Sequence, residues 1–511
     1  MSESADIEIG ASKGDLWRTL WRTHYYAGLL AGLLLVWLAV SGLGILYKGP
    51  IQSLLYHGAN HVAIGGSRAT LEEQVTSAKK MFPKDTFSYV IPGASATDAT
   101  SVGLSEPSGE TRVVWTNPYT GGVTGSMIDG TDLPAFFNRY HGSIFPRTWL
   151  MPVPNVAWLF SEGPAWNHVE VGEVVVEIGA GWGLTLAATG LFLWWPRRSS
   201  PARWRPTKER KGRKRWRDLH TFLGLFLAGF LMFSVVTGLP WAAFWGTSWQ
   251  TLASHVTPNK AMFWSDPSPS SATPKLGDMT RFGTPVAWAM TNDVPSPSND
   301  PMPSMPGMHH GGGGSNAMPT DGLPAAVLSL DHIQSLMLQE GMSANATIYP
   351  PTNTTDQGKA RFGSYVVMNP WPSSIGQQKA MYFDEFTGNK LGESTAKEWG
   401  AIQRATELGV QTHMGTQFGI WTRLFMTLGC LLVLWNFFTG VMMWNRRRRG
   451  TLGIPRRPIE PHLLRPLGWA ILVLGVVYPL WGLSVVVILI FDKYVIQRIP
   501  SLRRAFGMPQ K

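Results

Sequence analysis

Five long apolar segments constrain this chain more than any other feature of its sequence. Each holds roughly 20 or more mostly apolar residues, the length that an α-helix needs to cross about 30 Å of hydrocarbon. The first segment is too long for a removable signal peptide and has no small-residue cleavage site, so it should stay as an anchor. We therefore predict an α-helical integral membrane protein with about five transmembrane helices, at Tyr25–Tyr47, Val171–Trp195, Thr221–Trp245, Thr416–Trp444 and Leu467–Phe491.

The positive charge is concentrated in two short loops between these segments. The net charge is +11, and the loops at 196–219 and 445–466 are rich in Arg and Lys, whereas the long loops at 48–170 and 246–412 are more acidic. The positive-inside rule then predicts a cytoplasmic N-terminus (1–24) and periplasmic long loops in a bacterial inner membrane. No nucleic-acid partner is expected, because the cations flank the bilayer. The cationic tail at 492–511 would lie outside, against the rule.

The chain contains an internal repeat. Each half is an inbound helix, an external domain and an outbound helix, and the halves share short motifs. Each long loop also carries a helical stretch followed by an alternating strand and a turn, which predicts two small periplasmic α+β domains at about 67–130 and 325–395. The matching pairs are Trp21–Gly28 with Trp216–Gly224, Thr189–Arg197 with Thr439–Arg446, Leu71–Met81 with Ala325–Gln339, and Thr111–Thr116 with Ala380–Phe383.

Several of these motifs together resemble the PepSY-associated transmembrane family, whose members include ferric-siderophore reductases of bacterial inner membranes. The resemblance covers nearly the whole chain and rests on His141–Phe145, Glu177, Arg217–His220, Thr237–Trp241 and His413–Gly415. It implies PepSY-like external domains, haem as cofactor, and a ferric-siderophore complex as periplasmic acceptor. It does not specify one substrate, because the family is functionally diverse.

Four histidines are the candidate cofactor ligands. His24 and His220 fall at the cytoplasmic ends of the first and third segments, and His141 and His413 precede the second and fourth outside. Two histidines at each membrane face are what two stacked b-type haems would require. The only cysteine, Cys430, lies within the fourth segment, so covalent haem attachment is excluded and each haem must be held non-covalently.

A simpler interpretation of the same residues remains open. Gly28 and Gly32 follow His24 on one helix face and could leave room for a macrocycle. They could equally be small packing residues between helices, with histidines that only face headgroups. The alternative ligands, none with a counterpart in the other half, are His168, His57, His61 and His462.

Two further features have competing interpretations. A buried Glu177 would need a partner, for which Arg423 at comparable depth is available, although simple helix pinning is the preferred explanation. A Pro-, Ser- and Gly-rich insert at about 290–320 cannot form a core. Its thioethers and imidazoles are ligands that suit Cu(I), and the alternative is that they only fill a linker. The candidate ligands are Met302, Met305, Met308, His309 and His310.

The sequence contains no dinucleotide-binding fingerprint, Walker loop or nucleophile motif. Electrons would therefore come from quinol or from a cytoplasmic reductase docked near the basic loops. Three functions follow as hypotheses. The first is a haem-containing reductase that moves electrons across the membrane to a ferric-siderophore complex. The others are copper reduction or handling at the Met/His insert, and a non-redox PepSY membrane protein that binds a periplasmic partner.

Overall fold

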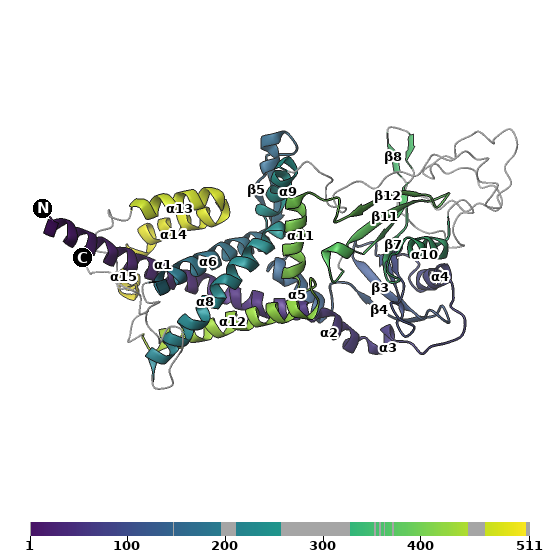
Figure 1. The fold of residues 1–511 in the computed structure, drawn as a ribbon, viewed down its shortest axis with the longest axis horizontal. Helices are drawn as coiled ribbons and strands as arrows, with labels where there is room; N and C mark the ends of the chain where they lie inside the picture. The colour runs from purple at the N-terminus through teal and green to yellow at the C-terminus, as the bar shows by residue number, and fades with distance from the viewer. Residues whose placement is uncertain are drawn as a thin grey trace.

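The protein is a multi-pass membrane protein with a large extramembrane sheet (Figure 1). The structure, a computed structural model, describes residues 2–146, 148–195, 211–256, 328–351, 354–356, 359–361, 363–369, 372–447 and 465–506. Five helices in these ranges are long and apolar enough to cross a membrane. Four of them overlap predicted segments: α1 (Ser2–Leu46), α6 (Val171–Trp194), α8 (Arg213–Gly238) and α12 (Ile420–Asn445). Helices α6 and α12 agree closely with the prediction, whereas α1 begins well before Tyr25 and α8 both begins and ends before the predicted bounds.

These four helices form a bundle in which α1 and α8 lie diagonally opposite each other. Helix α1 packs on α6 and α12, and α8 packs on the same two helices. The shared core is apolar and includes Ala39, Phe230, Met426 and Val433. A side chain projecting inward from α1 therefore faces one projecting inward from α8, across the middle of the bundle.

The predicted fifth helix is replaced by a helical hairpin. Helix α13 (Arg465–Val477) ends at Val477, and after Tyr478 the next helix, α14 (Pro479–Phe491), begins with a proline, which cannot continue the preceding helix. The two helices pack against each other, and Gly482 approaches the Gly475 backbone so closely that a Cβ would lie 2.6 Å from its carbonyl oxygen. The candidate span is thus Pro479–Ile496 rather than Leu467–Phe491.

The hairpin returns the chain to the end of the bundle where it started. A short π-helix, η8 (Asp492–Ile496), and α15 (Pro500–Ala505) follow α14. The Phe506 ring stacks on Tyr26 of α1 with centroids 6.3 Å apart. The first and last described residues, Ser2 and Phe506, therefore lie toward one end of the bundle, which we call the termini end, and the end beside the large sheet is the sheet end (Figure 1).

The two predicted α+β modules share a single antiparallel sheet. Its strand order is β12-β11-β10-β7-β1-β2-β3-β4, and β1 meets β7 where Val90 pairs with Ile348. Helices α4 (Leu71–Met81) and α10 (Leu330–Gln339) contribute to one continuous core with the strands. The strands are β1 (Thr86–Ile91), β2 (Thr100–Ser105), β3 (Thr111–Thr116), β4 (Val123–Ile128), β7 (Thr347–Tyr349), β10 (Ser364–Met368), β11 (Lys379–Asp384) and β12 (Lys390–Thr395).

Helices α4 and α10 cap each other. The Leu71 N–H donates to the Asp331 carboxylate (3.0 Å), and the Leu330 N–H donates to the Glu72 carboxylate. Each acid thus satisfies a free amide at the N-terminus of the opposite helix, where negative charge is favoured. Burial, together with the neighbouring Asp331, raises the pKa of Glu72 to about 8.

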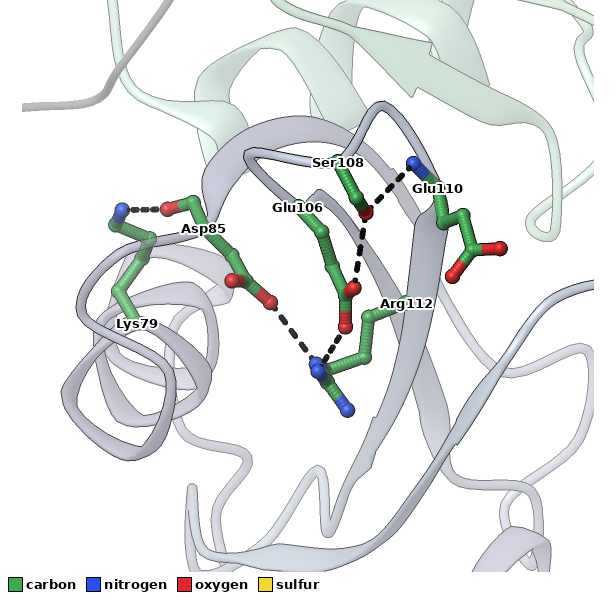
Figure 2. Close-up of polar contacts among 6 residues, drawn as sticks. All are labelled: Lys79, Asp85, Glu106, Ser108, Glu110 and Arg112. Atoms are coloured by element: carbon green, nitrogen blue, oxygen red, sulfur yellow. Dashed lines mark hydrogen bonds and ion pairs between the residues drawn. The ribbon is translucent and has the colours of Figure 1, made fainter.

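A polar network fastens α4 to the β2–β3 hairpin (Figure 2). The Arg112 Nε donates to Asp85 (2.9 Å), and its guanidinium also pairs with Glu106, which accepts from Ser108. Lys79 of α4 donates to the Asp85 carbonyl. This network lies in the first half of the sheet.

Two helices lead from the sheet back to the bundle. After β4, α5 (Leu133–Gly142) packs on α1 and carries His141 in its last turn. After β12, α11 (Ala401–His413) packs on α8 and ends at His413. The following Gly415 has φ of 72°, and a Cβ there would overlap Leu46 of α1, so this close turn requires glycine.

The remaining described elements are short. Helices α2 (Lys48–Leu55) and α3 (His57–Asn60) connect α1 to the sheet, and β8 (Thr354–Asp356) pairs with β9 (Lys359–Arg361). A hairpin of β5 (Leu150–Pro154) and β6 (Trp166–Glu170), with η1 (Val156–Phe160) at its tip, precedes α6. The last three elements are η3 (Leu239–Trp241), α9 (Trp245–Val256) and η6 (Ile375–Gln377).

Candidate functional site

The structure brings the four candidate histidines together as two pairs. At the termini end, His24 of α1 and His220 of α8 have ring centroids 6.3 Å apart and ring planes at 84°. At the sheet end, His141 of α5 and His413 of α11 have centroids 6.3 Å apart and planes at 69°. We call these the termini-end pair and the sheet-end pair. Each pair joins the first half of the chain to the second.

Every one of these histidines is held through Nδ1 by a hydroxyl on an adjacent helix. The oxygen lies 2.9–3.1 Å from the ring nitrogen in all four cases. The partners are Thr189 for His24, Thr439 for His220, Ser41 for His141 and Thr237 for His413.

The hydroxyls also determine the tautomer of the imidazoles. Each hydroxyl has one proton and already donates it to a carbonyl of its own helix. Ser41 donates to the Trp37 carbonyl (2.8 Å), and Thr237 donates to the Phe233 carbonyl (2.8 Å). Thr189 and Thr439 do the same within α6 and α12. A hydroxyl has no second proton, so it must accept from the imidazole, and Nδ1 carries the hydrogen. Each Nε2 then has a free lone pair, the form in which histidine binds a metal.

A glycine follows each hydroxyl residue and allows the imidazole to approach. A Cβ at Gly190 would lie 3.2 Å from the His24 Cε1, and at Gly42 it would lie 3.5 Å from the His141 Cε1. Gly238 and Gly440 face His413 and His220 in the same way, at 3.5 and 3.9 Å. Four Ser/Thr-Gly dipeptides therefore form four matching cradles.

The site predicted from the sequence did not include these cradles, although the sequence carries a periodic signal for them. Ser41 follows His24 by 17 residues, and Thr237 follows His220 by the same number. At 1.5 Å per residue this spacing separates the two histidine levels by about 25 Å along α1 and along α8. Each inbound helix thus contributes a histidine at one level and a hydroxyl-glycine cradle at the other.

Burial favours the neutral form of the sheet-end pair. It lowers the pKa of His141 and the pKa of His413 to about 4, with the proximity of the two rings adding to the effect at His141. Both imidazoles are therefore uncharged at neutral pH. A neutral imidazole with a fixed tautomer is suited to metal ligation rather than to ion pairing.

The separation within each pair matches two axial ligands of one metal ion. A ring nitrogen lies about 1.1 Å from the imidazole centroid for ring bonds of about 1.33 Å, and a metal–imidazole bond is about 2.0 Å long. Two imidazoles on opposite sides of one metal therefore have centroids about 6.2 Å apart. The observed 6.3 Å at both levels is compatible with two imidazoles that share one haem iron. At the termini end these would be His24 and His220, which lie on the diagonally opposed helices α1 and α8.

The glycines that follow His24 have a different environment from the cradle glycines. A Cβ at Gly32 would lie 3.0 Å from the Phe437 ring of α12, and at Gly28 it would lie 3.7 Å from Leu186 of α6. These contacts are helix packing, the simpler of the two interpretations of these residues. Helix packing brings α6 and α12, with their cradles, close to α1.

Polar contacts fix α11, and with it His413, to the sheet. The Gln411 Nε2 donates to Gln378 (2.7 Å) and to Glu407 (3.1 Å), and the Gln417 side chain accepts from the Ile375 N–H (2.8 Å). All of these side chains are buried, and burial raises the pKa of Glu407. These hydrogen bonds therefore fix the position of His413 in the sheet-end pair relative to the sheet.

The alternative histidines lie elsewhere. His57 and His61 stack on each other with centroids 4.6 Å apart, and His168 lies in β6 opposite Pro152. Glu177 accepts a hydrogen bond from the Phe244 N–H (2.8 Å), and no ion pair with Arg423 occurs between these two described side chains. His462 and the Met/His insert, including Met302, Met305, Met308, His309 and His310, lie outside the described residues.

Comparison with known proteins assigns the chain to a family. No curated protein sequence matches it. The family model of the PepSY-associated TM region, however, matches residues 21–447, which includes both histidine pairs and all four cradles. Since this match covers most of the chain, the protein belongs to the PepSY-associated transmembrane family.

Proposed function

We propose that this protein is a haem-containing membrane reductase that carries electrons across the bilayer to an acceptor at the sheet end. The observation that carries the proposal is the pair of bis-histidine arrangements, each with centroids 6.3 Å apart and with every Nδ1 hydrogen-bonded to a hydroxyl. His24 and His220 would hold one haem b, and His141 and His413 a second. A haem iron bound in this way supplies one-electron chemistry, since it cycles between the ferric and ferrous states.

The residues around each pair would orient the imidazoles and exclude water. The hydroxyls hold the imidazoles in the tautomer that offers Nε2, and the apolar core between the two levels excludes water. Because each pair takes one ligand from each half of the chain, loading the sites would also clamp the two halves together. This arrangement supports an internal repeat in which the halves are equivalent.

The orientation follows from the charges at the termini end. The described cations at the termini end include Arg213, Arg217 and Arg446. Arg498 and Arg503 of the C-terminal segment lie at the same end. All of them obey the positive-inside rule if the termini end is cytoplasmic. The sheet is then periplasmic in a bacterial inner membrane, and the sheet-end pair lies closest to an external acceptor.

The acceptor we favour is a ferric-siderophore complex. The resemblance to ferric-siderophore reductases of this family supports it, and reduction would release iron as the less tightly held Fe(II). Purified protein tests the proposal: we expect a Soret band, split α-bands in the reduced state, two haems per chain, and oxidation of the reduced haems by a ferric hydroxamate. A colourless protein would leave a non-redox PepSY protein as the better description.

A further inference from the structure

The tip of the α13–α14 hairpin meets a second helix break beside α6. Tyr478 at the tip and Trp481 in α14 are both buried, and Trp481 packs against Gly181 of α6. The second break follows α8, where η3 contains Pro240 and α9 starts at Trp245. Broken helices within a membrane are stable only where protein covers them or where they line a polar site, and such breaks often mark binding sites.

Glu177 of α6 lies between these two breaks. Its side chain is 1% exposed, and its Oε2 accepts the Phe244 N–H at 2.8 Å. The other oxygen, Oε1, is buried and has no hydrogen-bond partner among the described residues. A buried carboxyl oxygen without a hydrogen bond destabilises the folded protein unless a ligand donates to it or a proton binds it.

Unused hydrogen-bonding groups lie in a side-chain cluster next to this carboxyl. Tyr478 and Trp245 belong to one cluster of packed side chains, and the Tyr478 hydroxyl is near enough to Glu177 to interact with it electrostatically. Buried polar groups are normally satisfied, so several unsatisfied ones at one place call for a ligand. Within the described part of the chain, the buried atoms of this cluster without a partner are Tyr478 Oη, Trp481 Nε1 and Trp245 Nε1.

We propose that Glu177, Tyr478 and the adjoining helix breaks bind and oxidise a lipid hydroquinone from the bilayer. The ligand must come from the membrane, donate a hydroxyl to Glu177 Oε1, and accept from Tyr478 and from an indole N–H. A hydroquinone ring has two hydroxyls that meet these needs, and its flat aromatic face suits the neighbouring Trp245 and Trp481. This inference rests on the proposed function, because the haems are its electron acceptors.

The step balances with two haems. Oxidation of one hydroquinone to the quinone breaks two O–H bonds and releases two electrons and two protons. Haems held by the two histidine pairs would accept these electrons, one at each ferric iron. The Glu177 carboxylate takes one proton, and water at the sheet end takes the other. The two electrons can then leave singly to a ferric acceptor.

The position of Glu177 suits this role. Gly179, two residues further along α6, packs against Leu34 of α1, and Ser41 of the sheet-end cradle follows Leu34 by seven residues. This spacing is about 10 Å along the helix axis. The proposed site is therefore nearer the sheet-end pair than the termini-end pair, so electrons should reach the sheet-end haem first.

The test uses the full chain in nanodiscs with decylubiquinone and decylubiquinol as probes. Glu177→Gln and Tyr478→Phe are compared with Glu173→Gln, one turn away on α6, and Tyr494→Phe, which is half exposed. We expect anaerobic calorimetry on protein with reduced haems to show decylubiquinol binding that is at least tenfold weaker in Glu177→Gln. Binding of decylubiquinone, which has no hydroxyl to donate to Glu177, should not weaken. Haem reduction by decylubiquinol should slow about 10²-fold, and reduction by dithionite should not change.

The outcomes separate the two proposals. Equal decylubiquinol binding and equal quinol-driven reduction in all four variants would overturn the hydroquinone site while leaving the reductase in place. A chain without haem would refute the proposed function, and the calorimetry would still decide whether Glu177 binds the hydroquinone. Unchanged haem spectra in the variants show that the fold is intact.

Discussion

At the scale of single residues, the proposed function of this protein rests on small groups that carry no charge. Four hydroxyls fix the protons of four imidazoles, and four glycines let the rings approach. The hydroxyl is useful because its own proton is already committed to a helix carbonyl. It can therefore only accept from the imidazole, which leaves Nε2 free for a metal.

Replacing a cradle hydroxyl should weaken one haem site without changing the shape of the helix. In Thr237→Val the His413 Nδ1–H loses its acceptor, and the affinity of the sheet-end site for haem should fall about 10- to 100-fold. Haem titration into the haem-depleted protein measures this. Thr221→Val is the matched control, because Thr221 bonds only to the Arg217 carbonyl on the same helix. Equal haem affinity in both variants would show that the hydroxyl has no such role.

Adding one methyl group should have opposite effects at two glycines. In Gly190→Ala the new Cβ would lie 3.2 Å from the His24 ring, so the ring must shift and the termini-end haem should bind less tightly. In Gly229→Ala the Cβ meets nothing within 4 Å, and the free energy of unfolding should rise by up to about 1 kcal/mol because Ala favours the helix. Haem retention during thermal unfolding distinguishes the two. Weaker haem retention in both variants would argue against a specific cradle.

At the scale of elements, the two α+β modules act as one body. Helices α4 and α10 exchange caps across the middle of the sheet, and the strands continue from β1 to β7 without a gap. Hydrogen bonds from Gln411 and to Gln417 then hold α11, which ends at His413, against the sheet. The sheet is therefore placed to hold the sheet-end histidine in position.

The exchanged caps predict a pH-dependent stability. The pKa of Glu72 is about 8 in the folded protein and close to 4.5 when unfolded, so the folded state holds the extra proton between these values. The contribution of Glu72 is fully present below about pH 4.5 and is lost as the pH rises through 8. Unfolding of the full chain followed by β-sheet circular dichroism should therefore show falling stability from pH 6 to 9. Glu72→Gln should flatten this slope, and Glu73→Gln, exposed on the same turn, should not.

The sequence predicted much of this architecture because its signals are local. Helix α4 and strand β3 begin and end where predicted, since the capping residue Thr70 and the turn at Asn117–Gly122 define them. The joining of the two modules depends on pairing between Val90 and Ile348, far apart in the chain. No local pattern shows such a pairing, so two separate modules were expected.

At the scale of the whole molecule, the C-terminal hairpin resolves a conflict in the topology. A single helix over the fifth apolar segment would place the cationic tail outside. Apolar length alone cannot distinguish one helix from two half-length helices, and the break depends on Pro479 and the close contact of Gly475 with Gly482. With the hairpin, the tail lies at the termini end with the other cations.

Reporter fusions test this arrangement. A fluorescent protein fused after Lys511 should be active in the cytoplasm, and alkaline phosphatase at the same place should be inactive. Fusions at Lys208 and Arg448, in loops outside the described residues, should behave alike, whereas fusions within the sheet should give the reverse. Active alkaline phosphatase after Lys511 would contradict the hairpin.

The haem content of two histidine variants tests the central claim most directly. Wild-type protein should carry two haems per chain, and His220→Ala and His413→Ala should each carry one, because each removes one ligand of one pair. The two variants should lose different components of the split reduced α-band. Pyridine haemochrome assays and low-temperature spectra of the purified proteins give both quantities. Two haems retained in both variants would show that these histidines are not the ligands.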